Sequence, residues 1–401
     1  MSLDDDVILG GTPRAAPATL VLSSERVLIE GELQPAVLSL QDGRVHQVWW
    51  GSADPARAGV TGETVALGSR VVLPGMVDTQ VRVDEPGQHA GEGFASATRA
   101  AALGGVSTIL DLSLAALPPT TTVRALDARR AAAETARARG DLHCDVGFWG
   151  AAVPGNAEDL EPLWAAGVLG FRCSVAGSGG PELPPLAPDE LLDAMGRIAW
   201  FGGLLAVHAE GPTALAGLLD AVRETGARTH VPHVSSARTL DLIVRAKDEG
   251  LPVTAETCHH NLVLDARARS DGAATTGTCC PSGRDRGDQD ALWQGLREGV
   301  LDGVGGVGSA RHGGLAALAA AARRRDVSLA DVSRWTSANA AALVGLDRGP
   351  RRKGAITEGA AADLIVYDPV AGTTFPAARG AVDPSPAESA PCLLRRPDAT
   401  R

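Results

Sequence analysis

Two histidines and two arginines offer the clearest chemistry in this sequence. His208 lies in the segment VHAE and His233 in VPHVSS, each within a short β-rich run. Imidazole binds zinc, but zinc usually takes three or four protein ligands, so the pair also fits histidines that only form hydrogen bonds at strand ends. Arg82 and Arg172 offer paired N–H donors to a carboxylate or phosphate. These residues suit a residual metal site or an anion site, provided that the fold brings them together.

The elements that must position these side chains follow a β/α alternation. Short β-rich runs such as VSTILDL, from Val106, are followed by alanine-rich helical runs such as ALDARRAAAETARAR. Counted with the run that ends near residue 81 and a weaker one near Gly303, the β-rich runs number eight. This pattern predicts an α/β fold with a (β/α)8 TIM-like barrel, whose functional residues belong at the C-terminal ends of the strands.

Both ends of the chain have a different pattern. From about Leu20 to Leu67, short apolar runs are broken by turn residues, and KGAITEGAAADLIVYDP near the C-terminus has a similar character. We therefore expect a small β-sandwich domain built from both ends. The predicted divisions are residues 1–70 for its N-terminal part, 71–346 for the barrel, and 347–401 for returning strands and an irregular tail.

Composition excludes several classes of function. A net charge of -11 over 401 residues argues against nucleic-acid binding, and the cluster Arg351, Arg352 and Lys353 is expected to be a solvated loop. The opening MSLDDD lacks the features of a signal peptide, and no apolar run reaches the length of a membrane span, so we expect a cytoplasmic location. The six cysteines form no CxxC pair, which predicts reduced and mostly buried thiols.

The run VVLPGMVDTQVRVDEPG at residues 71–87 resembles the first-strand motif of the cyclic amidohydrolases, the group of dihydroorotases and allantoinases. Blocks such as GFASATRAAALGGVSTILDL, DVGFWGAAVPGN, HVSSA, ETCHH and GAAADLIVYDP are similar to allantoinase blocks and stand in family order. In that family two zinc or other divalent ions are held by a His-x-His pair, a carboxylated lysine, two further histidines and an aspartate. The metals lower the pKa of a bridging water, and the aspartate handles its proton.

The resemblance implies that His208 and His233 match the ligands of strands five and six. The other ligand positions hold different side chains: Gln80 and Arg82 for the paired histidines, Arg172 for the lysine and Val307 for the aspartate. A guanidinium cannot form the bridging carbamate, because it has no neutral nucleophilic amine. The family's substrate-contact positions correspond to Ala115 and to the segment from Cys279 to Arg284.

Several other residues could in principle complete a metal site, although none stands at a family ligand position. They are Glu210, Glu256, Cys258, His259, His260 and His312. We expect His259 and His260 to point to opposite faces of an extended segment. Other histidines are predicted to be surface or packing residues, namely His46, His89, His143 and His230. Cys173 and Cys258 are predicted to be buried, inert thiols.

Three functional hypotheses remain open. The first is a non-catalytic, allantoinase-like protein of purine and ureide catabolism ancestry, with a dismantled binuclear site and no predicted cofactor. The second is an active metal-dependent hydrolase of cyclic amides with a reduced or rebuilt site. The third is a binding or partner protein: a homo-oligomer, a subunit of an active paralogue, or a protein that binds a small anion through Arg82, Asp84, Arg172, His208 and His233. Salt bridges from Asp84 and Glu210 to the two arginines would close that anion site.

Overall fold

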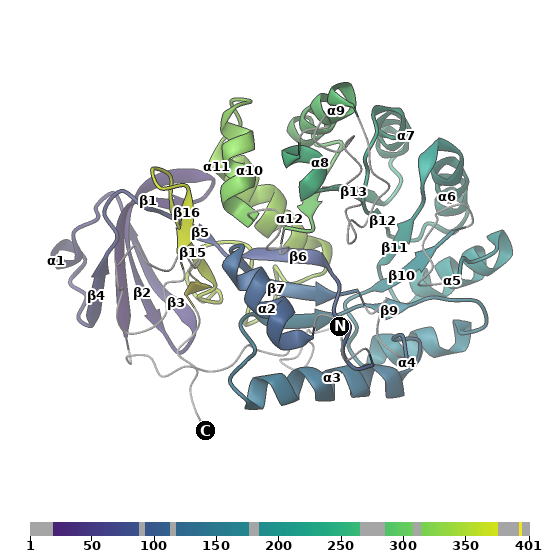
Figure 1. The fold of residues 1–401 in the computed structure, drawn as a ribbon, viewed down its shortest axis with the longest axis horizontal. Coiled ribbons are helices and arrows are strands. Elements are labelled where there is room, and N and C mark those ends of the chain that lie inside the picture. The colour runs from purple at the N-terminus through teal and green to yellow at the C-terminus, as the bar shows by residue number, and fades with distance from the viewer. Residues whose placement is uncertain are drawn as a thin grey trace.

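The chain forms a barrel with a small β-domain beside it (Figure 1). The computed structural model describes residues 19–87, 93–112, 118–175, 184–264, 285–307, 314–375 and 393–394. Three positions and one segment named from the sequence therefore lie outside the described residues: His89, Ala115, His312 and the segment from Cys279 to Arg284.

The β-domain is a mixed sheet with the strand order β16-β15-β5-β1-β2-β3, in which β4 also pairs with β1 and β17 with β15. The N-terminal elements are β1 (Leu20–Ile29), β2 (Glu32–Gln41), β3 (Arg44–Trp50), helix α1 (Pro55–Ala58), β4 (Glu63–Ala66) and β5 (Val71–Pro74). The C-terminal strands are β15 (Leu364–Asp368), β16 (Thr373–Phe375) and β17 (Leu393–Leu394). The expected small β-domain built from both ends of the chain is thus confirmed, and it has an apolar core of its own.

Two boundaries differ from the sequence prediction. β5 pairs with β15, with Val72 opposite Val366, so residues 71–74 belong to the β-domain and the barrel begins only at Met76. The motif that carries the family resemblance therefore spans both parts. The tail after residue 371 is not wholly irregular either, because β16 and β17 both pair with β15.

The barrel wall consists of parallel strands. They are β6 (Met76–Val81), β7 (Val106–Asp111), β8 (Asp145–Phe148), β9 (Gly150–Ala151), β10 (Phe171–Ser174), β11 (Leu205–His208), β12 (Thr229–Val231), β13 (Val253–Cys258) and β14 (Gly303–Gly305). β9 continues the strand position begun by β8, and β14 contacts β6, so the described residues form a wall of eight strand positions. The predicted (β/α)8 barrel is confirmed.

Helices follow the barrel strands along the chain and cover the outside of the wall (Figure 1). They are α2 (Phe94–Leu103), α3 (Val123–Ala138), η1 (Ala157–Asp159), α4 (Leu160–Ala165), α5 (Pro188–Trp200), α6 (Gly211–Thr225), α7 (Ala237–Asp248), α8 (His259–Val263), α9 (Arg286–Arg297), α10 (Gly314–Arg323), α11 (Leu329–Ser333), η4 (Arg334–Ala338) and α12 (Asn339–Leu343). Local signals set their ends: the Thr122 side chain caps α3, and Gly226, with a φ of 64°, ends α6 in the left-handed conformation.

The barrel strands are buried on both faces. All six residues of β7 are buried, because one face of a barrel strand meets the interior and the other meets the helices. Cys144, Cys173 and Cys258 are buried thiols, which agrees with the prediction for these three cysteines. No helix within the described ranges is long and apolar enough to cross a membrane.

Lys353 departs from the sequence prediction, because it is buried rather than part of a solvated loop. Its Nζ donates to Asp145, at 2.7 Å, and to Asp363, and only 3% of its side chain is exposed. Asp145 opens β8 of the barrel and Asp363 directly precedes β15 of the β-domain. The lysine therefore joins the two parts of the molecule. The sequence alone did not predict these ion pairs, because Asp145 lies 208 residues from Lys353 and Asp363 lies beyond intervening turns.

Candidate functional site

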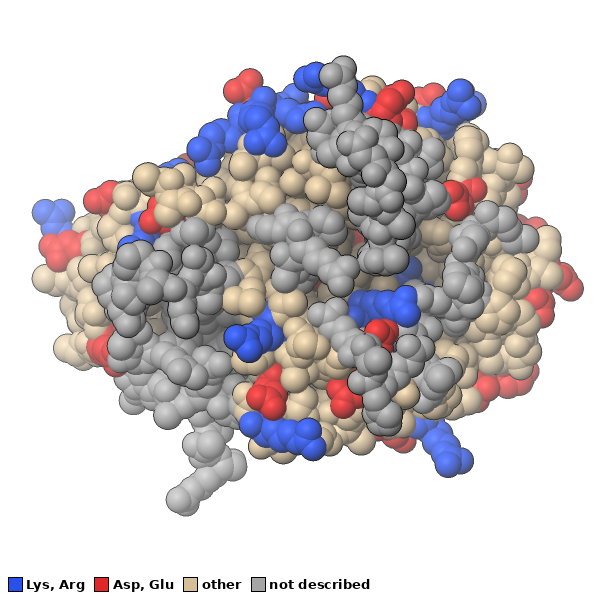
Figure 2. Space-filling model, in the orientation of Figure 1, with Lys and Arg blue, Asp and Glu red and all other residues tan. Residues whose placement is uncertain are grey.

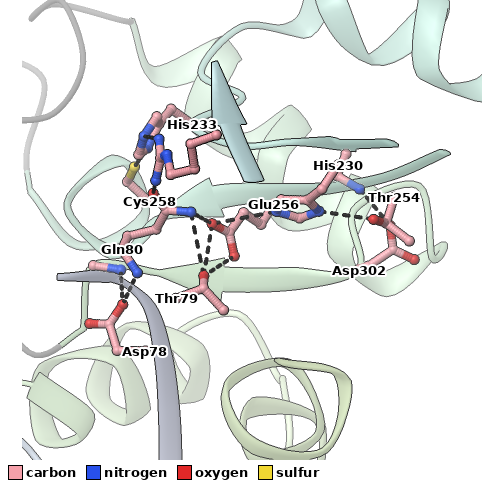
Figure 3. A network of polar contacts seen from close by, with 12 residues as sticks. Asp78, Thr79, Gln80, His230, His233, Thr254, Glu256, Cys258 and Asp302 are labelled. Carbon is pink, nitrogen blue, oxygen red and sulfur yellow. Dashed lines mark hydrogen bonds and ion pairs between the residues drawn. The ribbon is translucent and has the colours of Figure 1, made fainter. Parts of the chain in front are cut away.

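A buried polar network lies inside the barrel, and Figure 3 shows its members from β6 and β13 pointing toward one another. Gln80, near the end of β6, is 8% exposed, and Arg172, on β10, is 4% exposed. His208 ends β11 and His233 follows β12, at 8% exposure. Parallel strands place their C-terminal ends at one rim, which is why residues far apart in the sequence meet here.

Arg172 links the two sides of this network. Its Nη1 donates to Oε1 of Gln80 at 2.5 Å, and its Nη2 lies 3.4 Å from Nε2 of His233. Because a guanidinium can only donate, the Nε2 that faces it serves as an acceptor, and a neutral His233 then carries its proton on Nδ1. That Nδ1 lies 3.0 Å from Sγ of Cys258. The guanidinium thus occupies the strand position to which the resemblance assigns the carboxylated lysine.

Glu256, on β13, is the centre of the network. It is 3% exposed and accepts hydrogen bonds from the Thr79 hydroxyl, at 3.1 and 3.2 Å, and from Nε2 of Gln80 at 2.5 Å. Nε2 of His230 lies 3.5 Å from Oε1, an ion-pair distance without hydrogen-bond geometry, while Nδ1 of His230 lies 2.9 Å from the Thr254 hydroxyl. The side chain is therefore held from several strands at once.

The charge of Glu256 is stabilised by this environment. Burial raises the pKa of its carboxyl, but the imidazole of His230 and the hydrogen bond from Thr79 are among the contacts that outweigh burial and hold the pKa below its ordinary value. A buried carboxylate of this kind needs donors around it. The amide nitrogen of Gln80 is one such donor. The side-chain oxygen of Gln80 accepts from Arg172, so this one amide connects β6 to both β13 and β10.

The backbone of β14 lies directly against the side chains of the network at Gly305. A Cβ added to Gly305 would lie 2.6 Å from Cγ of Gln80 and 2.8 Å from Oε1 of Glu256, so only glycine fits there. Asp78 braces the same corner, because its Oδ1 accepts from the backbone N–H groups of Gln80 and Gly306, each at 2.9 Å. Val307 follows directly and is 1% exposed, with no group that can move a proton.

The two arginines of the predicted anion site have different surroundings. The Arg82 side chain is 49% exposed and its Nε pairs with Oδ1 of Asp84 at 2.9 Å, whereas Arg172 is buried and bonded to Gln80. The expected partner Glu210 precedes α6 and has no ion pair within the described part of the chain. Of the two salt bridges expected to close the anion site, the one between Arg82 and Asp84 is present. Arg172 bonds to Gln80 instead of Glu210.

His208 and His233 remain close, with ring centroids 5.5 Å apart and an edge-to-face arrangement. His233 has a φ of 62°, a left-handed conformation that is uncommon for a residue with a side chain. Backbone strain of this kind often marks a functional site, and here it stands at a family ligand position.

Two of the other histidines differ from the sequence prediction. His259 and His260 begin helix α8 instead of lying on an extended segment, and both are buried, with Nε2 of His259 3.1 Å from the Gly314 carbonyl oxygen. His230 is buried within the network, which agrees with the packing role that was one of the two predicted for it. The spacing of Thr254, Glu256 and Cys258 on one strand could have indicated an inward polar face, since alternate residues share a face.

A binuclear metal centre does not fit the residues present. The position of the family's bridging carboxylated lysine holds the buried guanidinium of Arg172. Gln80, at another ligand position, already forms hydrogen bonds with Arg172 and Glu256. Within the described ranges no group of three or more histidine, cysteine, aspartate or glutamate side chains is arranged to hold a metal ion. The surviving pair, His208 and His233, is too small a ligand set for zinc by itself.

Comparison with known proteins decides the family. The amidohydrolase family model matches residues 71–391. The chain belongs to the amidohydrolase family. It is 42% identical over 399 residues to an allantoinase of Streptomyces avermitilis, a match covering 87% of this chain and 86% of the relative. It is 33% identical to the allantoinase of Saccharomyces cerevisiae, with 86% of each chain covered. The predicted resemblance to allantoinases is confirmed.

Solved structures of the amidohydrolase fold are also similar. The L-hydantoinase (dihydropyrimidinase) from Arthrobacter aurescens superimposes with a TM-score of 0.74 at 23% identity, covering 86% of each chain. The dihydropyrimidinase from Brevibacillus agri gives a TM-score of 0.73 at 22% identity, covering 88% of this chain and 86% of the other. At these identities the likeness supports the fold alone. The family generally uses divalent metals, which makes the donor set of this member unusual.

Proposed function

We propose that this amidohydrolase is a non-catalytic, allantoinase-like protein whose binuclear metal site has been replaced by a hydrogen-bonded network. The observation that carries the proposal is the buried guanidinium of Arg172, bonded to Gln80 at 2.5 Å where the family would have its bridging lysine.

Electrostatics favours this proposal. A divalent ion at the rim would meet the fixed positive charge of Arg172, and like charges in a buried site repel strongly. Gln80 would also have to leave both Arg172 and Glu256 before it could turn toward a metal, leaving buried polar groups without partners. At the positions matched to the family, the described residues thus offer neither its full ligand set nor, at Val307, the carboxylate with which the family activates water.

The second candidate is an active hydrolase of cyclic amides with a reduced or rebuilt metal site. The relatives favour it, because the proteins that match most of this chain at 42% and 33% identity are named allantoinases. His208, His233 and a neighbouring donor such as Cys258 would have to form such a site, with Arg172 displaced from His233.

One experiment distinguishes the two candidates. The purified protein is incubated with zinc, manganese or cobalt, dialysed, and measured for metal content and for allantoin hydrolysis, beside the Streptomyces avermitilis relative as positive control. We expect well under one metal per chain and no turnover above background. Stoichiometric metal that survives dialysis, together with turnover abolished by His208→Ala, would instead establish the rebuilt site.

Of the two non-catalytic roles, anion binding and association with a partner subunit, the contacts of the two arginines favour association. An anion held between the two arginines would have to displace Asp84 from Arg82 and Gln80 from Arg172. Association with a homologous subunit requires no such rearrangement, because the outer helices and loops are available whatever occupies the barrel.

A further inference from the structure

A cavity of about 200 Å³ lies where the β-domain meets the barrel helices, away from the network at the rim. Its lining comes from β1, α10, α11 and β15, with Arg26 and Arg323 contributing guanidinium groups and Tyr367 a phenol. Ala319, Val327 and Leu329 supply apolar walls. Figure 1 shows α10 and α11 beside β15 and β16, which is where the two parts of the molecule come together.

The charge at this cavity is uncompensated. Arg26 is half-buried and Arg323 exposed, and neither forms an ion pair with any side chain in the part of the chain that the structure describes. The carboxylate that follows Tyr367, on Asp368, is already engaged: it pairs with Arg70 at 3.6 Å and accepts from the backbone N–H groups of Val370 and Ala371. Two guanidinium groups therefore face the cavity with no identified counter-charge.

The buried phenol adds a third donor. Tyr367 is 1% exposed, and its hydroxyl oxygen accepts a hydrogen bond of 3.4 Å from Nη2 of Arg323, a length at which the bond is weak. Its own proton can point to a ligand. In Figure 2 basic side chains gather along the upper edge of the molecule over α10 and α11, with a few acidic side chains beside them, although the whole chain carries a net charge of -11.

Size and polarity together define the ligand class. The volume is below the range of about 300–1,000 Å³ that is common for pockets of drug-sized molecules, so the occupant has to be small. Arginine forks recognise carboxylates and phosphates, while the walls of alanine, valine and leucine favour an apolar body over a bare inorganic ion. We propose that the cavity between Arg26, Arg323 and Tyr367 binds a small organic carboxylate with an apolar body.

Calorimetry with benzoate as the probe, and inorganic phosphate as the comparison, tests this site on the whole protein. We expect benzoate to bind more tightly than phosphate at millimolar concentrations. Arg26→Gln and Arg323→Gln should each weaken benzoate binding by about tenfold or more, as expected when a charge-assisted hydrogen bond is lost. Arg324→Gln is the matched control, because this neighbouring arginine is exposed and does not line the cavity.

Several results would overturn the proposal. Absence of heat with benzoate would do so, and so would binding that both cavity variants leave unchanged. An equal loss in Arg324→Gln would mean that diffuse surface charge attracts the anion, and phosphate bound as tightly as benzoate would mean that the apolar walls contribute nothing. Thermal melting of each variant confirms its fold. None of these outcomes depends on whether the barrel rim is catalytic.

Discussion

Arg172 is the side chain that most changes the character of this amidohydrolase. A buried guanidinium is costly unless its hydrogen bonds are made, and here Gln80 and His233 lie against it while Glu256 supplies negative charge beyond Gln80. The metals of the family would have brought positive charge to the same place. The guanidinium of Arg172 now contributes a fixed positive charge there, and its hydrogen bond to Gln80 ties β10 to β6.

Removing this guanidinium should destabilise the protein. We expect Arg172→Met to lower the free energy of unfolding by about 2–3 kcal/mol, because Oε1 of Gln80 loses its donor and Glu256 remains buried. Urea denaturation measures the change. Arg82→Met is the matched control, since its half-exposed ion pair with Asp84 should be worth about 1 kcal/mol or less. Equal losses in the two variants would contradict a special role for Arg172.

Cys173, the next residue, should be chemically inert. Burial raises the pKa of its thiol to about 12, and the neighbouring charge of Arg172 offsets only part of this rise. At pH 8 the thiol therefore stays protonated, and the thiolate is the form that reacts. We expect no alkylation of Cys173 by iodoacetamide in the folded protein and full alkylation in urea. Rapid labelling before unfolding would show that the thiol is accessible and ionised.

The residues of the site could be predicted from the sequence only where a motif marked them. Gln80, Arg172, His208 and His233 stand in recognisable blocks, and the barrel pattern puts their strand ends at one rim. The role of Glu256 was missed, because its partner Gln80 lies 176 residues earlier in the chain. Hydrogen bonds across a barrel depend on side-chain direction and on close approaches such as the one at Gly305, which spacing along the chain does not specify.

Elements were predicted well where a run is long and periodic, and less well at junctions. The β/α alternation located β7, since the predicted run VSTILDL and the strand both begin at Val106, because buried parallel strands are continuous apolar runs. The junction at Gly75 was missed, since β5 and β6 form one apolar run in the sequence although they belong to different sheets. Gly75 separates them, and its N–H donates to the Asp363 carbonyl oxygen at 2.7 Å.

The connection between the two parts of the molecule should depend on Lys353. We expect Lys353→Met to cost about 3–5 kcal/mol in urea denaturation, because Asp145 and Asp363 would then be two buried carboxylates without their cation. The only other lysine of the chain provides the control: Lys247 pairs with Asp302 at a more exposed position, and Lys247→Met should cost about 1 kcal/mol or less. A small loss for Lys353→Met would mean that other contacts hold β8 and β15 together.

At the scale of the whole molecule, the barrel and β-domain are complete while the chemistry at the rim has changed. The buried clusters of barrel and β-domain remain continuous, and the network from β6 to β13 adds polar contacts in the middle. At Gly305 the strands approach so closely that only glycine fits. The binding role proposed above needs this scaffold but no set of metal ligands.

Binding to another subunit is the whole-molecule property that we expect. Two tryptophans lie at the surface, Trp200 at the end of α5 with 87% exposure and Trp50 at the end of β3 with 63%. Large exposed aromatic side chains are typical anchors of protein interfaces, because burying them on a partner recovers apolar area at little entropic cost. Light scattering should therefore give a mass above the 41.0 kDa of one chain, or a pull-down from the host should retain a homologous amidohydrolase.

Surface variants make the prediction specific. Trp200→Glu should weaken association if α5 lies in the interface, and Trp50→Glu if β3 does, whereas Arg324→Gln, a polar change at an exposed residue after α10, should leave the mass unchanged. Because both tryptophans are exposed, their replacement removes little from the core and the monomer should stay folded. A single-chain mass at micromolar concentration, with no homologue retained from the host, would leave the exposed aromatics without a partner and would remove the basis for a subunit role.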